Sequence, residues 1–288
     1  LSHRLHFLSL GKLHFKVFLL SGINQHYHDI PGGIEPPETI LKAFDAKYPD
    51  ARDTEWTVND DYYVIEFKNN ALDNTAWFNH LGVWAMIKTE LPLNQLPAPI
   101  TADIRQGKYA GWKIEEADTI GRAGMGTVYK VEVEKGQQDT ALYYTAYGDL
   151  IKATADKDDA DQPVTIPEKV ANLMEQTFQG AELLDIENTT FDVQLDVLDK
   201  TILKIVKLTQ IYTWESTTWK LSKQEVPSVI MNAFRTSEYR NDTVESIYMY
   251  VDANGAFYKF NVVHNGQAVT VEFDVFGNIV TNRKGYIS

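Results

Sequence analysis

The sequence predicts an α+β protein of four tandem repeats, each with one helix followed by an antiparallel β-meander of about four strands, arranged as two halves. Self-similarity at a fixed period is the signature of a repeat architecture. Residue i can be laid over residue i+130 without a gap across the first sixty positions, so that Trp84 meets Trp214. Helix-start motifs of the type Pro-x-x-(Ile/Val) recur at Pro37, Pro97, Pro167 and Pro227.

Each repeat is expected to begin with a helix at its proline. Proline suits the first helical position because its missing N–H costs nothing there. Apolar residues follow at helical spacing, with Val170, Met174 and Phe178 in the third repeat and Ile40, Phe44 and Tyr48 in the first. One apolar stripe on each helix indicates that every helix packs on a sheet.

Strand patterns follow each helix. Tyr63, Ile65 and Phe67 alternate with residues of the opposite face, as expected for a half-buried strand. A glycine nineteen residues after the first tyrosine of such a strand predicts a hairpin turn, and it is present in three repeats as Gly82, Gly148 and Gly277. The third repeat has Tyr212 at this place, so we expect its turn to be built differently.

The composition divides the chain into four segments. Residues 1–35 are basic and rich in histidine, which predicts a disordered leader or a partial secretion signal. Residues 36–155 form the first half, with two repeats, and residues 163–288 form the second half, also with two repeats. The acidic stretch 156–162 is predicted to be a solvated linker. A calcium site there is the minor alternative, since the spacing departs from that of an EF-hand loop.

The overall composition excludes several classes of function. The net charge is -13 and no run of Lys and Arg is present, which argues against nucleic acid as a partner. The absence of cysteine excludes disulfides, thiolate zinc sites and cysteine nucleophiles. No run reaches the ~20 apolar residues that a transmembrane helix needs. We predict no metal site and no cofactor.

The motifs that could carry catalysis are weak. The segment Ile120–Lys130 resembles the glycine-rich loop of bacterial Ser/Thr kinases, but His-Arg-Asp and Asp-Phe-Gly motifs do not occur in the chain. We interpret its glycines as an elongated turn. His80 and His264 are predicted to be solvent-exposed turn residues, and no Gly-x-Ser-x-Gly motif is present. We therefore predict no catalytic residues and no enzyme activity.

Three aromatic residues are predicted to share the face of the first sheet that points away from the helices. If Phe78 and Tyr144 face the helices, the preceding residues Trp77 and Tyr143 face outward, and Tyr62 shares their face. Large rigid aromatic side chains suit a protein interface, so we predict a partner-binding site at these three residues. The alternative is that the second sheet or the linker packs on this face and buries them.

Several of these motifs resemble PepSY-like domains, also called β-lactamase-inhibitor-like, which occur in secreted or periplasmic proteins of gut Bacteroidota. The resemblance covers roughly residues 36–286 and rests on four segments, Pro37–Ala51, Tyr62–Phe67, Ala76–Phe78 and Gly82–Trp84. It implies an exported tandem α+β module, periplasmic or extracellular, without catalytic machinery. Kinship to the inhibitors implies a concave sheet surface for protein binding, and kinship to PepSY domains implies peptidase regulation.

The sequence thus predicts an exported, non-catalytic, inhibitor-like module that binds a protein or a peptide. One alternative is a glycan or peptide hydrolase that uses carboxylates, because 40 acidic residues offer many pairs. It would require acidic residues that converge in a pocket with raised pKa values. The other alternative is a passive surface or scaffold protein, which would have a polar outer sheet face and no partner. The sequence names neither the partner nor the oligomeric state.

Overall fold

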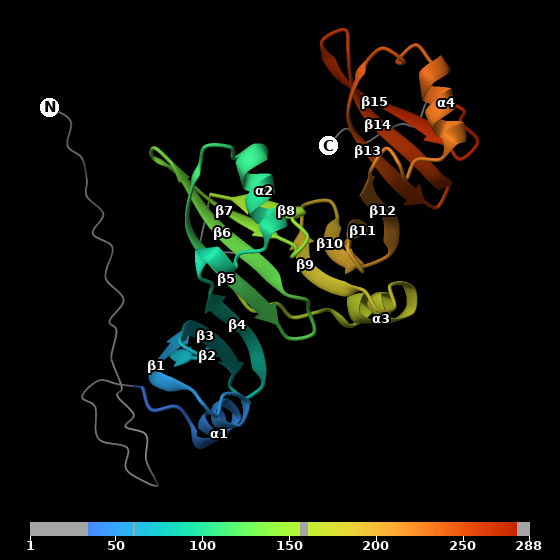
Figure 1. Ribbon diagram of the computed structural model, residues 1–288. Coiled ribbons are helices and arrows are strands. Elements are labelled where there is room, and N and C mark those ends of the chain that lie inside the picture. Colours follow the sequence, from blue (N-terminus) through green and yellow to red (C-terminus); the bar gives the residue numbers. More distant parts are fainter. Residues whose placement is uncertain (1–33, 60, 156–160, 281–288) are drawn as a thin grey trace, which may run out of the picture.

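The computed structural model describes residues 34–59, 61–155 and 161–280. The predicted leader lies outside this part except for its last two residues, and so do residues 156–160 of the predicted linker. The described residues form four α-helices and two antiparallel sheets, with more residues in strands than in helices (Figure 1). The predicted α+β class is therefore confirmed.

The first sheet has eight strands in the order β1 to β8, each hydrogen-bonded to the next strand along the chain. Helix α1 precedes this meander, and helix α2 lies between β4 and β5 in the chain. The elements of this half are α1 (Glu38–Lys47), β1 (Arg52–Asn59), β2 (Tyr62–Asn69), β3 (Leu72–Asn79), β4 (Trp84–Glu90), the 3₁₀ helix η1 (Leu93–Gln95), α2 (Ala98–Gln106), β5 (Lys113–Arg122), β6 (Val128–Lys135), β7 (Gln138–Tyr144) and β8 (Leu150–Thr154).

The second sheet has seven strands in the order β15 to β9, and its neighbouring strands are also consecutive in the chain. Its last strand is followed by an isolated bridge between Phe273 and Ile279 rather than by a further strand. The elements of this half are α3 (Glu168–Thr177), β9 (Glu182–Asn188), β10 (Val193–Asp199), β11 (Ile202–Leu208), β12 (Trp214–Leu221), α4 (Ser228–Thr236), β13 (Thr243–Asp252), β14 (Gly255–His264) and β15 (Gln267–Asp274).

The four prolines of the helix-start motif occupy the same place, directly before the first residue of each helix. Each proline is thus the N-cap residue, one position earlier than predicted. Its carbonyl accepts a hydrogen bond from the backbone N–H three residues later, as in the 2.9 Å bond from Ile40 to Pro37. The side chains at this third position are fully buried, at 0% exposure, in Ile40, Ile100, Val170 and Ile230. The motif therefore starts the helix and anchors it to the sheet.

Each helix covers a separate apolar cluster on one face of its sheet. Under α1, Phe44 makes edge contacts with Phe67 and Phe78, at ring-centroid distances of 5.1 and 6.3 Å. Under α4, Phe234 stacks on Phe260 at 4.9 Å. Burial of such side chains stabilises the fold by about 1.5–3 kcal/mol each. The helices occupy one face, so the outer face of each sheet is left for other contacts.

The turn at Tyr212 is built like the turns at Gly82, Gly148 and Gly277, so the expectation of a different turn is wrong. Tyr212 has a φ of +65°, beside +88° for Gly148, and its N–H donates to Thr209 as that of Gly148 donates to Thr145. The left-handed conformation costs a residue with a side chain about 1–2 kcal/mol. Tyr212 packs against the apolar cluster under α3, which offsets part of that cost.

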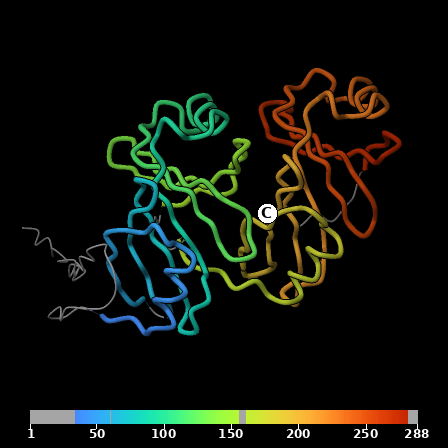
Figure 2. The backbone as a smooth tube through the Cα atoms, turned by 60° about the horizontal axis from the view of Figure 1, so that its bottom comes forward, coloured from blue at the N-terminus to red at the C-terminus, as the bar shows by residue number. Residues whose placement is uncertain are grey.

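The glycine-rich loop between β5 and β6 joins the two halves. It forms the predicted turn, and the N–H of Gly126 donates a 2.9 Å hydrogen bond to the carbonyl of Leu183 in β9. A side chain at position 126 would overlap Glu182 and Leu184. Glycine is required here because the loop backbone approaches β9 closely. Figure 2 shows the two halves side by side, each with its own helices.

Candidate functional site

The three aromatic residues predicted to bind a partner lie at the junction of the two halves. Trp77 is 7% exposed and Tyr143 is 1% exposed, while Tyr62 is half-buried. They belong to one apolar cluster with Leu184 and Leu198 of the second sheet. The expectation of an open face is therefore wrong for Trp77 and Tyr143, because the second half covers them. Their role in binding a partner is not tested by this burial and stays a prediction.

The end of the predicted linker lies across the same face. Lys130, which is 2% exposed, donates to Asp161 at 2.6 Å, and the hydroxyl of Tyr143 donates to the other oxygen of Asp161 at 3.2 Å. Arg122 donates to the carbonyl of Gln162 at 2.9 Å. A buried cation needs a partner of opposite charge, so Asp161 is drawn to the sheet and is only 8% exposed. The prediction of a solvated linker is wrong for Asp161.

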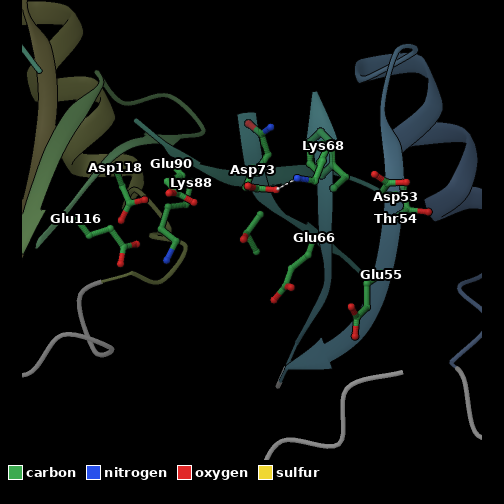
Figure 3. Close-up of a pocket in the computed structure, with 13 residues that line it drawn as sticks. Asp53, Thr54, Glu55, Glu66, Lys68, Asp73, Lys88, Glu90, Glu116 and Asp118 are labelled. Atoms are coloured by element: carbon green, nitrogen blue, oxygen red, sulfur yellow. Dashed lines mark ion pairs between the residues drawn. The ribbon is translucent and has the colours of Figure 1, made fainter. Parts of the chain in front are cut away.

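Beyond the junction, the outer face of the first sheet continues into an open groove of ≈ 460 Å³. Alternation along the strands places polar residues here, since Glu66 and Lys68 share their face with Val64 of the junction. Figure 3 shows the groove, with Asp118, Glu116, Glu90 and Lys88 at one end and Asp53, Thr54 and Glu55 at the other. The remaining lining residues are Glu66, Phe67, Lys68, Asp73, Asn74 and Thr75.

The groove is strongly acidic. Seven carboxylate side chains and two lysines line it. Lys68 forms an ion pair with Asp73 at 3.3 Å, and Lys88 points toward Asp161, with 3.8 Å between the charged atoms. The two lysines therefore compensate only part of the negative charge. A groove with this excess attracts cations and raises their local concentration.

Asp118 is the most unusual residue of the groove. It is 2% exposed, and its Oδ2 atom has no hydrogen-bond partner among the described residues. Burial raises the pKa of this carboxyl group to about 7, although the positive charge of Lys88 opposes the shift. At neutral pH the group thus exists in both protonation states. As a carboxylate, it can accept a hydrogen bond from a ligand.

The opposite end of the groove also contains buried oxygen atoms that lack a hydrogen-bond partner among the described residues. Within the described part of the chain, the hydroxyl of Thr54 and the Oε1 atom of Glu55 are buried without a hydrogen-bond partner. Thr54 itself is 4% exposed. Buried polar atoms are normally paired, and leaving one unpaired costs about 1–3 kcal/mol. Oxygen atoms at both ends of the groove therefore have hydrogen-bonding capacity that no described residue uses.

The described residues offer no other evident chemical centre. No three histidine, aspartate or glutamate residues among them are grouped so that they could hold a metal ion. No helix in the described ranges is long and apolar enough to cross a membrane.

The two histidines differ in their surroundings. His80 is exposed in the turn after β3, as predicted. His264 ends β14, half-buried, with its Nδ1 atom 2.7 Å from Asp242, so the prediction of an exposed turn residue is wrong for His264.

The groove was missed by the sequence argument, although its alternation carries the signal. On β2 the outer residues change from apolar Val64 to charged Glu66 and Lys68, and on β5 from Ile120 to Asp118 and Glu116. Reading both strands together would have indicated a polar continuation of the aromatic face. The burial of Asp118 depends on neighbouring strands and has no local signal in the sequence.

Comparison with known proteins supports the resemblance seen in the sequence. The chain matches the family described as "Putative beta-lactamase-inhibitor-like, PepSY-like" over residues 22–73, 61–152 and 212–281. A search among curated proteins gives no match.

Several solved structures are similar to the chain. A BLIP-like protein from Bacteroides fragilis is 26% identical, with a TM-score of 0.43, over 46% of this chain and 97% of that chain. A DUF2874 family protein from Bacteroides ovatus is 27% identical, with a TM-score of 0.41, over 44% and 94%. A protein from Bacteroides eggerthii described as "putative periplasmic" is 20% identical, with a TM-score of 0.40, over 42% and 88%. Because the family match spans more than half of its residues, the chain belongs to the beta-lactamase-inhibitor-like, PepSY-like family.

Proposed function

We propose that this protein is an exported, non-catalytic, inhibitor-like module that binds a protein or peptide in the acidic groove of its first half. The observation that carries the proposal is the buried carboxyl group of Asp118, which lines the groove without a hydrogen-bond partner among the described residues. An unpaired buried acid is costly, and a ligand that donates a hydrogen bond removes the cost. The family supports a binding role, and the resemblance seen in the sequence implies a periplasmic or extracellular location.

The finer organisation belongs to the same proposal. We infer that residues 36–155 and 163–288 are two halves, each of two repeats of one helix and about four strands. The equal places of the four prolines and the full burial of the residue three positions later support a common repeat. The fourth repeat departs from the pattern, because α4 is followed by three strands and the bridge at Phe273.

The proposal is tested with two peptides of equal length, one of alternating lysine and alanine and one of alternating glutamate and alanine. The ¹⁵N-labelled protein is titrated with each peptide, and amide signals of β1 to β5, the strands that line the groove, are followed. We expect shifts from the lysine peptide that weaken as salt is added, because charge attraction is screened. The lysine peptide should remain intact by mass spectrometry. Equal binding of both peptides, or shifts confined to other strands, would refute the groove as the site.

A carboxylate-dependent hydrolase is the second candidate, and one observation favours it. Asp118 has a pKa of about 7, which suits a general acid at neutral pH, and Glu116 and Glu90 lie at the same end of the groove (Figure 3). The test is to incubate reporter glycans and peptides with the native protein and with Asp118→Asn and to measure product formation. Product formation that Asp118→Asn abolishes would support the hydrolase and contradict the non-catalytic role.

A passive scaffold remains the third class to be tested. It shares with the binding module a polar outer face, which the groove provides. It differs in having no ligand, so the peptide titration separates the two. Lysine-peptide binding with loss of affinity in Asp118→Asn would exclude the scaffold.

A further inference from the structure

The junction between the halves shows what the outer face of a sheet in this protein can bind. Leu184, Leu198 and Leu203, on the outer face of β9 to β11, pack into the apolar cluster that contains Trp77 and Tyr143. Beside these leucines, Lys152 of β8 donates to the carboxylate of Asp185 at 2.5 Å. An apolar contact and this charged hydrogen bond hold the two halves, together with the backbone hydrogen bond from Gly126 to Leu183.

The acidic groove occupies the equivalent place on the first sheet. Glu55 stands opposite Glu66 in the ladder of β1 and β2, and Asp185 stands opposite Asp196 in the ladder of β9 and β10, 130 residues later. Lys68 opposite Asp73 likewise corresponds to Leu198 opposite Leu203. Glu55 of the groove is therefore the equivalent of Asp185, the residue of the second half whose carboxylate Lys152 binds.

The two surfaces differ in what fills them. Asp185 is paired with Lys152, whereas Glu55 keeps a buried oxygen without a partner among the described residues. The three leucines of the second half correspond to Thr54, Lys68 and Asp73, so the groove has a more polar surface. Its occupant must supply a cation to Glu55 and polar groups in place of the apolar cluster.

A second copy of this chain does not fit the groove. In the junction, Arg122 is close enough to Asp185 for mutual electrostatic stabilisation. The residue equivalent to Arg122 in the second half is Asp252, since Arg122 stands opposite Met86 and Asp252 opposite Ser216. Head-to-tail stacking of two copies would place this acidic residue near Glu55. Like charges in contact oppose this head-to-tail stacking, which favours a different molecule as the occupant.

We propose that the groove binds a partner protein through one lysine or arginine that the partner places against Glu55, as the first half places Lys152 against Asp185. This inference rests on the proposed function, and it adds the residue and the contact that select the partner. Thr54 and Asp118 lie at the two ends of the groove and accept further donors from the same surface. Arginine or lysine beside polar groups matches these acceptors, because both side chains are donors only.

The test uses N-acetyl-arginine methylamide as the probe and its citrulline analogue as a control of the same shape without charge. Binding is measured by ¹⁵N chemical-shift titration of the native protein, Glu55→Gln and Glu116→Gln. Glu116 is an exposed carboxylate of the same groove, so it is the matched control for charge. We expect affinity to fall about tenfold in Glu55→Gln and less than about twofold in Glu116→Gln, as for loss of one charged hydrogen bond.

The outcomes separate this inference from the proposed function. Arginine binding in the groove that falls equally in both variants would overturn the assigned contact and leave a cation-binding groove. Equal binding of the citrulline analogue would overturn the requirement for a cation. Signals of the groove that do not move with the probe would overturn both proposals. The ¹⁵N spectrum of each variant also shows whether it is folded.

Discussion

Replacing Asp118 by asparagine is expected to stabilise the protein at neutral and alkaline pH. Asp118 is buried, and this burial raises its pKa from the ordinary 3.8 to about 7. In the unfolded chain the same group loses its proton near pH 4. Between pH 4 and pH 7 the folded protein therefore binds more protons than the unfolded chain, and its stability falls as the pH rises.

The size of the effect follows from the difference between the two pKa values. A difference of about three in pKa corresponds to about 4 kcal/mol of unfolding free energy. Asparagine has no charge to bury, so Asp118→Asn should match the native protein near pH 4 and exceed its stability by up to about 4 kcal/mol above pH 7. Asp196 of the second half also has a pKa raised to about 7, but it is present in both proteins and cancels in the comparison.

Urea unfolding followed by tryptophan fluorescence between pH 4.5 and pH 8 measures this difference. Glu116→Gln is the control, since Glu116 lies two residues away on β5 and is exposed. Its unfolding free energy relative to the native protein should change with pH much less than that of Asp118→Asn, because the charge of Glu116 contributes less than burial to the raised pKa of Asp118. If the difference between Asp118→Asn and the native protein were the same at every pH, the argument from burial would be wrong. The same measurement shows whether Asp118 destabilises the folded protein, as expected for an acid that is retained for ligand binding.

Three further changes probe the fold. In thermal unfolding, Gly148→Ala should lower the free energy of unfolding by about 2–4 kcal/mol, and Gly136→Ala by about 1 kcal/mol. Both glycines have positive φ, but a Cβ at position 148 would lie 2.8 Å from a backbone oxygen of α2, whereas nothing lies within 4 Å of a Cβ at position 136. Leu198→Lys should weaken the packing between the halves, lower the free energy of unfolding by about 2–4 kcal/mol and enlarge the radius of gyration in X-ray scattering. An unchanged radius would contradict this. Lys130→Met should lower the free energy of urea unfolding by about 3 kcal/mol, because Asp161 loses the closer of its two lysine partners and keeps only Lys88 at 3.8 Å. Adding Asp161→Asn should recover more than half of this loss.

The features that could be predicted from the sequence are those that depend on residues close together in the chain. The proline and the apolar residue three positions later act within one helical turn, so the pattern at Pro37 and Ile40 was sufficient to place a helix on a sheet. Alternation along single strands also identified which face Trp77 and Tyr143 occupy. The registers of β2 with β3 and of β6 with β7 agree with this assignment.

The features that could not be predicted depend on contacts between distant residues. Whether Tyr143 is open or covered is decided by Leu184 and Asp161, which no local pattern connects to it. The charge run before Asp161 indicated solvent exposure, but a buried lysine on β6 required a partner. At Tyr212 the surrounding turn and the contacts of its side chain with the α3 cluster outweigh the local preference for glycine.

The repeat proposed above accounts for the position of the candidate site on the first sheet and not on the second. Equivalent positions on the two sheets differ in polarity. Leu198 and Leu203 make the outer face of the second sheet apolar, whereas Lys68 and Asp73 make that of the first sheet charged. The apolar version is covered by the neighbouring half, and the charged version remains open. Under that proposal, a few substitutions between the two sheets are sufficient to separate a structural contact from a surface available to a partner. The function of the chain should therefore be sought where its two halves differ.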